Sequence, residues 1–311
     1  MTGIKSTRDA YGEALMKLGE NPAVVVLDAD LSVSTQTIKF GEAYPDRFID
    51  VGCAEQNLIG VAAGLAIGGK IPYASTYAIF SMRAWEQIRN TVAHDGLSVK
   101  LVVSHAGLTN SADGASHQSL EDLALMRVIP GMSVIVPCDA NEAEKAIISE
   151  ASRPGPVYIR LNRSKTPVIM PADYRFEFGK AVTLAKGADL TLIATGTMVH
   201  AALTACELLK KENISARVIN IHTIKPFDER AVIESAKETG AVVTAEEHSI
   251  LGGLGGAVAE VLGEKCPVPL KRIGVYDVFG ESGEYEQLLE KYRLTPEAIV
   301  HSAKGVLEEK R

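Results

Sequence analysis

The sequence predicts two consecutive α/β domains, each with a mainly parallel sheet flanked by helices. Short β-branched runs alternate with helical patterns over almost the whole chain, which is typical of βαβ units. The strand-like runs are largely apolar along their length, as expected for strands covered on both faces. A polar segment with two prolines, residues 161–182, interrupts this alternation. We therefore expect a first domain over residues 1–165, a linker over 166–186 and a second domain over 187–311.

In the first domain, strands and helices follow one another in chain order. Residues with high β propensity, bounded by glycine, proline or aspartate, favour strands. Such runs occupy residues 23–30, 47–51, 71–76, 99–105, 132–137 and 157–161. The stretches between them predict helices over residues 55–67, 80–94, 119–127 and 140–151.

The second domain continues the alternation. Strands are expected over residues 189–195, 216–221 and 241–247, with helices over 198–212, near 228–238 and after "GGLGG" at 252–256. The spacing of these glycines does not match the GxGxxG dinucleotide fingerprint, and no acid follows at the required distance. We expect the glycines to allow close packing of a helix on a strand.

The composition argues against several classes of protein. A net charge of −7 disfavours binding to nucleic acid or to anionic membranes, since neither attracts an acidic surface. The four cysteines lie far apart without a CxxC pair, which favours reduced thiols over disulfides or a zinc site. The chain shows no signal-peptide core and no apolar run of membrane-spanning length. We therefore expect a cytoplasmic protein with no nucleic-acid and no membrane partner.

Polar and aromatic residues follow the strands of the first domain. In open parallel sheets, ligands bind outside the carboxyl ends of the strands. The residues placed there are Asp28, Asp30, Glu55, Tyr77, Phe80 and Arg160. Glu55 begins an apolar helix, where an acid also stabilises the helix through its free N–H groups and its dipole. Its position alone therefore leaves a purely structural role open.

A long polar loop, residues 104–122, follows the fourth strand and carries His105, Asp113 and His117. Long polar loops inside compact domains are usually functional or disordered. The two histidines lack the short spacing of zinc motifs, so we expect no metal site on them; simple solvation of both histidines is the alternative. Neither a GxSxG motif nor a cysteine in an activating context is present.

Several sequence blocks, in the same order, resemble the pyrimidine-binding and C-terminal domains of transketolase. They are "GCAEQNLIGVAAGLAIGG", "YASTYAIFSMRAWEQ", "ADGASHQSLEDLALMRVIPGMSVIVPCDANE" and "GTMVHAA…INIHTIKPFD…AEEHSILGGLGGAVAEVL". The resemblance runs from Arg8 to the end of the chain. It implies a thiamine-diphosphate-binding fold followed by a transketolase C-terminal-like domain. The implied activity is transfer of a two-carbon ketol unit from a ketose phosphate to an aldose phosphate, as in the pentose phosphate pathway.

The resemblance also implies how thiamine diphosphate is held. Glu55 would face N1′ of the aminopyrimidine, because a carboxyl group in apolar surroundings resists ionisation and can share a proton with that nitrogen. Tyr77 and Phe80 would pack against the ring, and Asp30 would lie near the thiazolium across the subunit interface. Arg83 stands where transketolases commonly carry an aromatic residue, which is closer to deoxyxylulose-phosphate synthase; an arginine can still stack on a ring.

A sugar-phosphate site in and around the polar loop is implied as well. His117 would contact the C1 hydroxyl or carbonyl oxygen of the substrate and assist proton transfer, and Asp113 would bind a substrate hydroxyl. The family's usual proline beside this histidine is absent from "GASHQS". Cations and hydroxyl donors suit a phosphate dianion. The residues implied for the phosphate are Arg8, Ser34, His105 and Arg160.

The diphosphate domain of transketolase has no counterpart in this sequence. That domain holds the metal and the diphosphate with a Gly-Asp-Gly motif and a later asparagine, and no GDG occurs in the 311 residues. Mg²⁺ or Ca²⁺ requires such hard oxygen ligands. The resemblance therefore implies the C-terminal half of a split transketolase without metal ligands of its own. A separate diphosphate-domain chain would hold the metal in an α2β2 assembly, and this chain alone would be inactive.

Three alternatives stay open at this level. The β subunit of a 2-oxo-acid dehydrogenase also supplies a glutamate without GDG, but "ADGASHQ", Arg8 and His105 resemble the sugar-phosphate enzymes better. Half of a split 1-deoxyxylulose-5-phosphate synthase is supported by Arg83 and "GCAEQ", whereas "TRD" at 7–9 and "DADLS" at 28–32 resemble transketolase better. The third alternative is a non-catalytic regulatory or scaffolding α/β protein.

Overall fold

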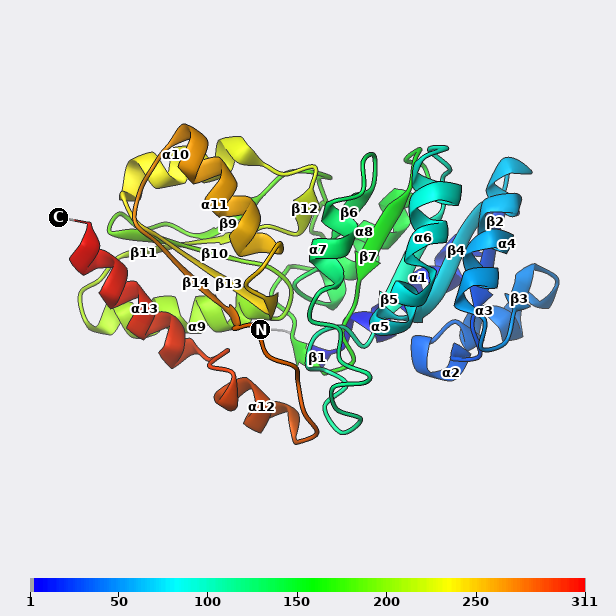
Figure 1. Ribbon diagram of the computed structural model, residues 1–311, viewed down its shortest axis with the longest axis horizontal. Helices are drawn as coiled ribbons and strands as arrows, with labels where there is room; N and C mark the ends of the chain where they lie inside the picture. The colour runs from blue at the N-terminus through cyan, green and yellow to red at the C-terminus, as the bar shows by residue number, and fades with distance from the viewer. Residues whose placement is uncertain (1–2, 311) are drawn as a thin grey trace.

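The computed structural model describes residues 3–310, which form two sheet-centred halves lying side by side (Figure 1). One half is built on a seven-stranded sheet and the other on a five-stranded sheet. A short ribbon pairs β1 (Ile4–Lys5) antiparallel with β8 (Thr166–Pro167). Residues 1, 2 and 311, at the outer ends of the two expected domains, lie outside the described part.

The seven-stranded sheet has the order β12-β6-β7-β5-β4-β2-β3. Its neighbours run parallel, except that β12 pairs antiparallel with β6. In chain order the strands are β2 (Val24–Asp28), β3 (Phe48–Asp50), β4 (Ile71–Tyr77), β5 (Lys100–Ser104), β6 (Ser133–Ile135), β7 (Val157–Arg160) and β12 (Thr223–Lys225). All but β12 coincide with the predicted runs to within two residues, so the prediction of a mainly parallel sheet is confirmed.

Helices cover both faces of this sheet, because successive strand residues point to opposite sides. On one face α1, α3 and α8 pack through Tyr11, Phe40 and Ile147, and on the other α4 and α7 pack through Leu58 and Leu123. The helices are α1 (Thr7–Leu18), α2 (Ser32–Thr35), α3 (Ile38–Ala43), η1 (Pro45–Arg47), α4 (Glu55–Ile67), α7 (Asp122–Arg127) and α8 (Ala140–Glu150).

Two predicted helices differ from the structure. The stretch expected as one helix over residues 80–94 forms successive short segments, namely α5 (Ala78–Ser81), η2 (Met82–Ala84), α6 (Trp85–Gln87) and the π-helical η3 (Ile88–Ala93). The helix expected from residue 119 begins only at Asp122. The main-chain oxygen of Leu120 accepts a hydrogen bond from Ser249 N of the second half at 2.7 Å, so residues before Asp122 are engaged in a contact between the halves.

The five-stranded sheet has the order β14-β13-β10-β11-β9 and is parallel except for β9, which is antiparallel to β11. Its strands are β9 (Val182–Ala185), β10 (Leu190–Ala194), β11 (Ala216–Asn220), β13 (Val242–Ser249) and β14 (Leu270–Val275). Its helices are α9 (Met198–Lys211), α10 (Glu229–Thr239), α11 (Leu254–Lys265), α12 (Tyr285–Lys291) and α13 (Pro296–Glu309). The edge strand β9 therefore lies within the segment 166–186 that was expected to be a linker.

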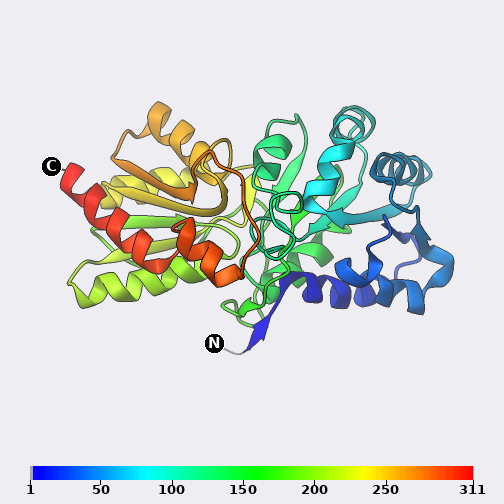
Figure 2. The ribbon, with the colours of Figure 1, turned by 60° about the horizontal axis from the view of Figure 1, so that its bottom comes forward.

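The two halves share one sheet and one core. Strand β12 comes from the second half of the chain but completes the first sheet, where Thr223 pairs with Ile135. The apolar cluster under α4 and α7 continues without a break into residues such as Ile193 and Leu254 of the second half. At this junction the polar loop lies beside the segment that precedes α12 (Figure 2). Among residues 3–310, no helix is both long and apolar enough to cross a membrane.

Candidate functional site

The residues predicted to form a site gather at one edge of the seven-stranded sheet. Strands β5, β4, β2 and β3 are consecutive and parallel, so their carboxyl ends meet at the same edge. Asp30 follows β2, Glu55 follows β3, Tyr77 ends β4 and His105 follows β5. The edge therefore brings together an acidic group, an aromatic group and a histidine.

Glu55 is the first residue of α4, as the sequence predicts. The preceding Ala54 makes no side-chain cap, so the free N–H groups of the first turn stay available to a negative charge. The Glu55 side chain is only 12% exposed, and its Oε2 lies 3.8 Å from Nε of Arg83, whose side chain is 75% exposed. A long, solvent-exposed ion pair is weak, so Arg83 leaves the carboxylate free to meet a ligand.

Asp30 lies beside this helix start in a strained turn. It has a φ of 62°, and its Oδ2 accepts a hydrogen bond from Cys53 Sγ at 3.4 Å. The turn is held by the buried Asp28 carboxylate, which accepts bonds from Leu31 N (2.6 Å) and Thr35 Oγ1 (2.6 Å). Burial raises the pKa of Asp28 to about 6. The turn thus presents Asp30 to solvent next to the Glu55 helix.

A row of rings runs along the same edge. Tyr77 stacks on His105 with ring centroids 3.8 Å apart, and on Phe80 at 5.4 Å. Phe80 in turn meets the edge of His117 at 5.3 Å. His117 is half-buried, with Nδ1 2.9 Å from Ser116 Oγ. The row therefore runs from His105 at the start of the polar loop, through Tyr77 and Phe80, to His117 near the end of the loop. Tyr77 and Phe80 are the rings expected to pack against a cofactor.

Arg8 and His105 form the polar end of this row. One Nη of Arg8 donates to His105 Nε2 (3.3 Å) and to the main-chain oxygen of Ser34 (3.0 Å). Because Nε2 accepts, the ring proton is assigned to Nδ1, which faces Ser104 Oγ at 2.8 Å. Burial, then the charges of Arg8 and Arg163, lower the pKa of His105 to about 3. His105 is therefore a neutral acceptor that orients Arg8, and the positive charge resides on the arginines.

Arg163 is the second cation of this group, and the strand-end reasoning misses it. Its side chain is exposed, and an Nη donates to Asn110 Oδ1 at 3.2 Å. After burial, its charge is among the causes of the lowered pKa of both Arg8 and His105, so its charge acts on both of them. The available signal is the second arginine of "YIRLNRS", residues 158–164, which lies beyond the end of the strand.

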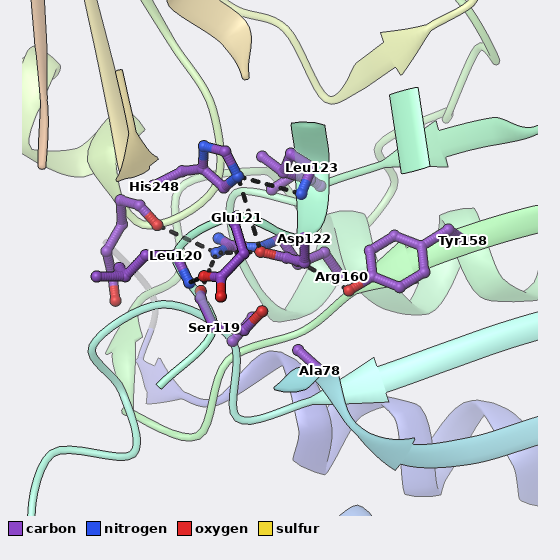
Figure 3. Close-up of polar contacts among 12 residues, drawn as sticks. Ala78, Ser119, Leu120, Glu121, Asp122, Leu123, Tyr158, Arg160 and His248 are labelled. Carbon is purple, nitrogen blue, oxygen red and sulfur yellow. Dashed lines mark hydrogen bonds and ion pairs between the residues drawn. The ribbon is translucent and has the colours of Figure 1, made fainter. Parts of the chain in front are cut away.

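Arg160 lies apart from this group, in a buried ion pair with Asp122 of the same half, where the first half meets the second (Figure 3). Its Nε contacts Asp122 Oδ2 at 2.7 Å, and its Nη2 contacts Asp122 Oδ1 at 3.1 Å. Burial alone would lower the pKa of Arg160, but Asp122 raises it. Nη2 also donates to the main-chain oxygens of Ser119 and Glu247. The donors of this guanidinium are therefore occupied by Asp122, Ser119 and Glu247. The structure does not bring Arg160 to Arg8 and His105.

The alternation of β7 explains this placement. Arg160 lies two residues after Tyr158 and shares its face of the sheet, where the Tyr158 hydroxyl donates to Asp122 Oδ2 at 2.8 Å. Both side chains therefore point to α7 rather than to the open edge. A position at the end of a strand does not by itself place a side chain in the ligand crevice.

Asp113 lies at the exposed tip of the polar loop. The buried ends of the loop, by contrast, are fixed by hydrogen bonds, such as Gly107 N to Ser119 O at 2.9 Å. His117 lies between the tip and the buried end, on the ring row. The structure therefore brings Tyr77, Phe80, His105 and His117 into one contact group, with Asp113 on the same loop.

Fold and site together define the family. Residues 5–168 match the transketolase pyrimidine binding domain, and residues 179–299 match the transketolase C-terminal domain. The chain belongs to the transketolase family and carries these two of its domains.

Similar proteins specify the kind of transketolase. The chain is 48% identical to a 6-deoxy-6-sulfo-D-fructose transketolase subunit of Clostridium sp. (strain MSTE9), over 97% of this chain and 95% of that protein. It is 50% identical to a putative transketolase C-terminal section of Methanocaldococcus jannaschii, over 99% and 98% of the two chains. A solved split-gene transketolase, described as an inactive β4 tetramer, is 52% identical with a TM-score of 0.93 and covers 99% of this chain. The chain is thus a transferase subunit of the split transketolase type, and the dehydrogenase and synthase alternatives are not favoured.

The residues present fit the pyrimidine end of thiamine diphosphate, the cofactor that family membership implies. An aminopyrimidine needs an aromatic face and a carboxylate at one ring nitrogen. Phe80 is half-buried with Tyr77 stacked on it, and Glu55 is nearly buried, with only the long ion pair to the exposed Arg83. Within residues 3–310, no group of three or more His, Cys, Asp or Glu side chains could hold a metal ion. The fit of Glu55, Tyr77 and Phe80 concerns the pyrimidine end of the cofactor.

Proposed function

We propose that this chain transfers a two-carbon ketol unit from a ketose phosphate to an aldose phosphate, together with a diphosphate-domain partner chain. The observation that carries the proposal is the edge where Glu55 begins α4 beside the ring row of Tyr77, Phe80 and His117. Such an edge offers a carboxylate, an aromatic face and a proton-transfer group to one ligand. When bound, thiamine diphosphate supplies the electron sink for cleavage of a C–C bond.

Each side chain of the edge has a task in this proposal. Glu55 would share a proton with the pyrimidine nitrogen of the bound cofactor, and Phe80 and Tyr77 would fix its ring by stacking. His117 exchanges a proton with the substrate oxygen next to the bond that breaks. Asp113 accepts a hydrogen bond from a substrate hydroxyl. Asp30 lies at the outer, open side of the site, toward a second chain.

The anion of the substrate is bound at the other end of the ring row. Arg8 and Arg163 supply two guanidinium groups, which suit bidentate contacts with phosphate oxygens. His105 orients Arg8 through Nε2, and Ser34 accepts from the same guanidinium. Arg160 takes no part in this site in our proposal, because its donors are used at the junction.

The exposed residues of the edge support a partner chain that completes the site. Asp30, Arg83 and Asp113 are all exposed, although each borders the proposed active centre. The partner would carry the diphosphate domain and hold Mg²⁺ or Ca²⁺. We propose an α2β2 assembly, and the solved relative at 52% identity is described as an inactive tetramer of β chains. The four cysteines are free thiols, which supports a location in the reducing cytoplasm.

Reconstitution tests the proposal. The chain is combined with its diphosphate-domain partner, thiamine diphosphate and Mg²⁺ or Ca²⁺, and assayed for ketol transfer from xylulose 5-phosphate to ribose 5-phosphate. Parallel assays use 6-deoxy-6-sulfofructose as donor, because one relative is named for that sugar, and two guanidinium groups accept a sulfonate as well as a phosphate. Oxo-acid decarboxylation or pyruvate condensation without ketol transfer would support the alternative enzymes and sink the proposal.

Glu55→Gln is the decisive variant in this assay. The amide can still donate or accept a hydrogen bond but cannot exchange a proton, so we expect transfer to fall by about 10²–10⁴-fold, as for loss of a general acid–base group. Glu86→Gln, an exposed glutamate on α6, serves as the control and keeps its activity. Transfer at the wild-type rate with Glu55→Gln would show that the catalytic assignment is wrong.

A further inference from the structure

The polar loop has a buried neck and an exposed tip. Gly107 and Ser119 close the neck as an isolated antiparallel bridge, with Gly107 N donating to Ser119 O at 2.9 Å. Leu108 and Ser119 are fully buried, whereas Asp113 at the tip is exposed. The position of the tip therefore depends in part on what holds the neck.

A carboxylate of the second half holds one side of the neck. Glu247 on β13 is 4% exposed, and its Oε1 accepts a hydrogen bond from Leu108 N at 2.7 Å. Its Oε2 accepts from Thr197 Oγ1 (2.6 Å) and from the Tyr285 hydroxyl (2.7 Å). The three donors come from the polar loop, from the start of α9 and from the start of α12. Both carboxylate oxygens are thus satisfied: Oε1 binds the neck, and Oε2 is held by two hydroxyls of the second half.

Thr197 binds Glu247 in place of capping its own helix. It is the N-cap residue of α9 but makes no side-chain cap, although threonine at this position usually accepts from the first helical turn. Its hydroxyl donates to Glu247 instead. On the loop, Gly107 packs directly against the Glu247 carboxylate. Its φ is +65°, and a Cβ at this position would collide with that carboxylate.

The main chain of Glu247 reaches the other side of the neck through Arg160. Nη2 of Arg160 donates to the Glu247 main-chain oxygen at 3.1 Å and to the Ser119 main-chain oxygen at 3.2 Å. The guanidinium is itself fixed by Asp122. Residue 247 is therefore linked directly to Leu108 and, through one guanidinium, to Ser119, so both strands of the neck are tied to it.

The tip has its own contact with the second half. Gln118 Nε2 donates to the main-chain oxygen of Glu281 at 3.0 Å, and Gly283 N donates to the main-chain oxygen of Ser111 at 3.1 Å. These bonds connect the loop to the segment between β14 and α12, the segment that leads to Tyr285. The neck is therefore held by β13 and the rest of the loop by the segment before α12, and Tyr285 at the start of α12 connects the two through its bond to Glu247.

We propose that Glu247 is a positioning residue for the reaction: it fixes the neck of the polar loop and so orients Asp113 and His117 from outside the active centre. This assigns the C-terminal domain a part in the reaction through the loop. Glu247 does not touch substrate or cofactor in this role. The proposal deepens the proposed function, on which the roles of Asp113 and His117 rest.

Amide hydrogen exchange on the full chain tests the physical claim without any assay of activity. Glu247→Ala leaves Leu108 N–H buried without an acceptor, so amides of residues 105–121 should exchange about tenfold faster or more, in line with the loss of one buried hydrogen bond. In Glu247→Gln one oxygen still accepts from Leu108, and the hydroxyls of Thr197 and Tyr285 can turn to accept from the new amide. Exchange of the loop should then stay near that of the wild type.

Glu142 is the matched control. It is fully buried at the same junction and accepts from Asn220 Nδ2 of the second half at 2.9 and 3.1 Å and from Cys138 N at 2.8 Å, but it makes no hydrogen bond to the polar loop. Glu142→Ala removes a comparable buried carboxylate and should leave exchange over 105–121 unchanged. If Glu247→Ala does not fold, the double variant Thr197→Val, Tyr285→Phe takes its place, since it removes both donors to Oε2 and the carboxylate is no longer fixed; exchange of the loop should then rise as well.

The reconstituted enzyme supplies the second readout. A misplacement of about 1 Å can cost about 10²-fold in rate, so we expect kcat for ketol transfer with Glu247→Ala to fall to that extent. The Kd of thiamine diphosphate should stay at the wild-type value, because Glu55 and Phe80 lie outside the loop. Glu247→Gln should recover most of kcat. Equal losses in Glu247→Ala and Glu142→Ala, or loop exchange at the wild-type rate in Glu247→Ala, would overturn the proposal, whereas an inactive wild-type complex would sink the proposed function.

Discussion

Arg160 and Arg163 lie close in the chain but in opposite surroundings. Arg163→Met removes an exposed guanidinium from the anion site, so we expect KM for the ketose phosphate to rise about tenfold, the worth of one charge-assisted hydrogen bond. Arg160→Met leaves Asp122 buried without its cation and should lower the free energy of unfolding by about 3–5 kcal/mol. Steady-state kinetics of the complex and urea unfolding of each chain measure the two effects. If KM rose with Arg160→Met and not with Arg163→Met, Arg160 and not Arg163 would be the arginine of the anion site.

His105 makes the stability of the chain depend on pH. Its pKa of about 3 in the folded chain lies below the ordinary histidine value of 6.5. The unfolded chain therefore takes up this proton at higher pH than the folded chain, and stability is lost as the pH falls below 6.5. Between pH 7.5 and pH 5 the loss from this group is about 1–2 kcal/mol. His105→Asn removes the titration, so its free energy of unfolding should fall less over the same interval.

Urea unfolding of the wild type and of His105→Asn at pH 5, 6 and 7.5 measures this difference. His222 and His248 also have a pKa lowered to about 4 by burial, and they titrate alike in both proteins. They cancel in the comparison, so an equal loss of stability in the two proteins would mean that His105 is not the neutral, buried acceptor of Arg8.

Site residues at or just after the end of a strand could be predicted from the sequence. Residues whose place depends on tertiary contacts could not. Glu55, Tyr77 and His105 each follow a strand of one sheet, so their meeting follows from parallel topology. The influence of the Arg163 charge on His105 depends on the path of the chain after β7. Glu247 had a readable signal in two consecutive acids within an apolar run, "VVTAEE" at 242–247, because buried acids need donors, but nothing in the run names Leu108 as one of them.

At the level of secondary structure, predictability follows from length and apolar content. The runs behind β2 to β7 are rich in β-branched or aromatic residues and are bounded by turn residues, and they form strands close to the expected ends. Strand β12 is only three residues, TIK, and carries no periodic signal. Its pairing with β6 arises because the chain of the second half returns to the first sheet. The strands with a long apolar run could thus be predicted from the local sequence. The strand β12 could not, because it forms only when the second half of the chain packs against β6.

The helix expected over residues 80–94 illustrates a different limit. Its apolar content predicts one continuous helix, but the segment forms short helical pieces from α5 to η3. The first piece, α5, carries Phe80, whose ring stacks on Tyr77 at the end of β4, and the Trp85 Nε1 donates to the main-chain oxygen of Leu125 on α7 at 3.1 Å. Contacts at both positions compete with regular helix geometry, so the periodic pattern overstates the continuity of the helix.

On the scale of the whole molecule, each half completes the other. The first sheet ends in β12 from the second half, and Lys225 of this strand donates from Nζ to the main-chain oxygens of Arg127 and Ile129 at 2.9 and 2.6 Å. Glu142 on α8 bonds to Asn220 at the end of β11. The shared apolar core and these bonds mean that the division into residues 1–165 and 187–311 describes sequence segments more closely than independent folding units.

This dependence predicts how fragments behave. Residues 1–168 expressed alone would expose the unpaired edge of β6, since β12 would be missing, together with the apolar surface that residues such as Ile193 and Leu254 cover in the full chain. Unpaired strand edges and large apolar patches promote aggregation. We therefore expect this fragment to form aggregates or large oligomers in size-exclusion chromatography with light scattering. Co-expression with residues 169–311 restores the missing strand and should recover a soluble one-to-one complex. A monomeric fragment 1–168 that unfolds cooperatively by itself would show that β12 and the shared core are dispensable.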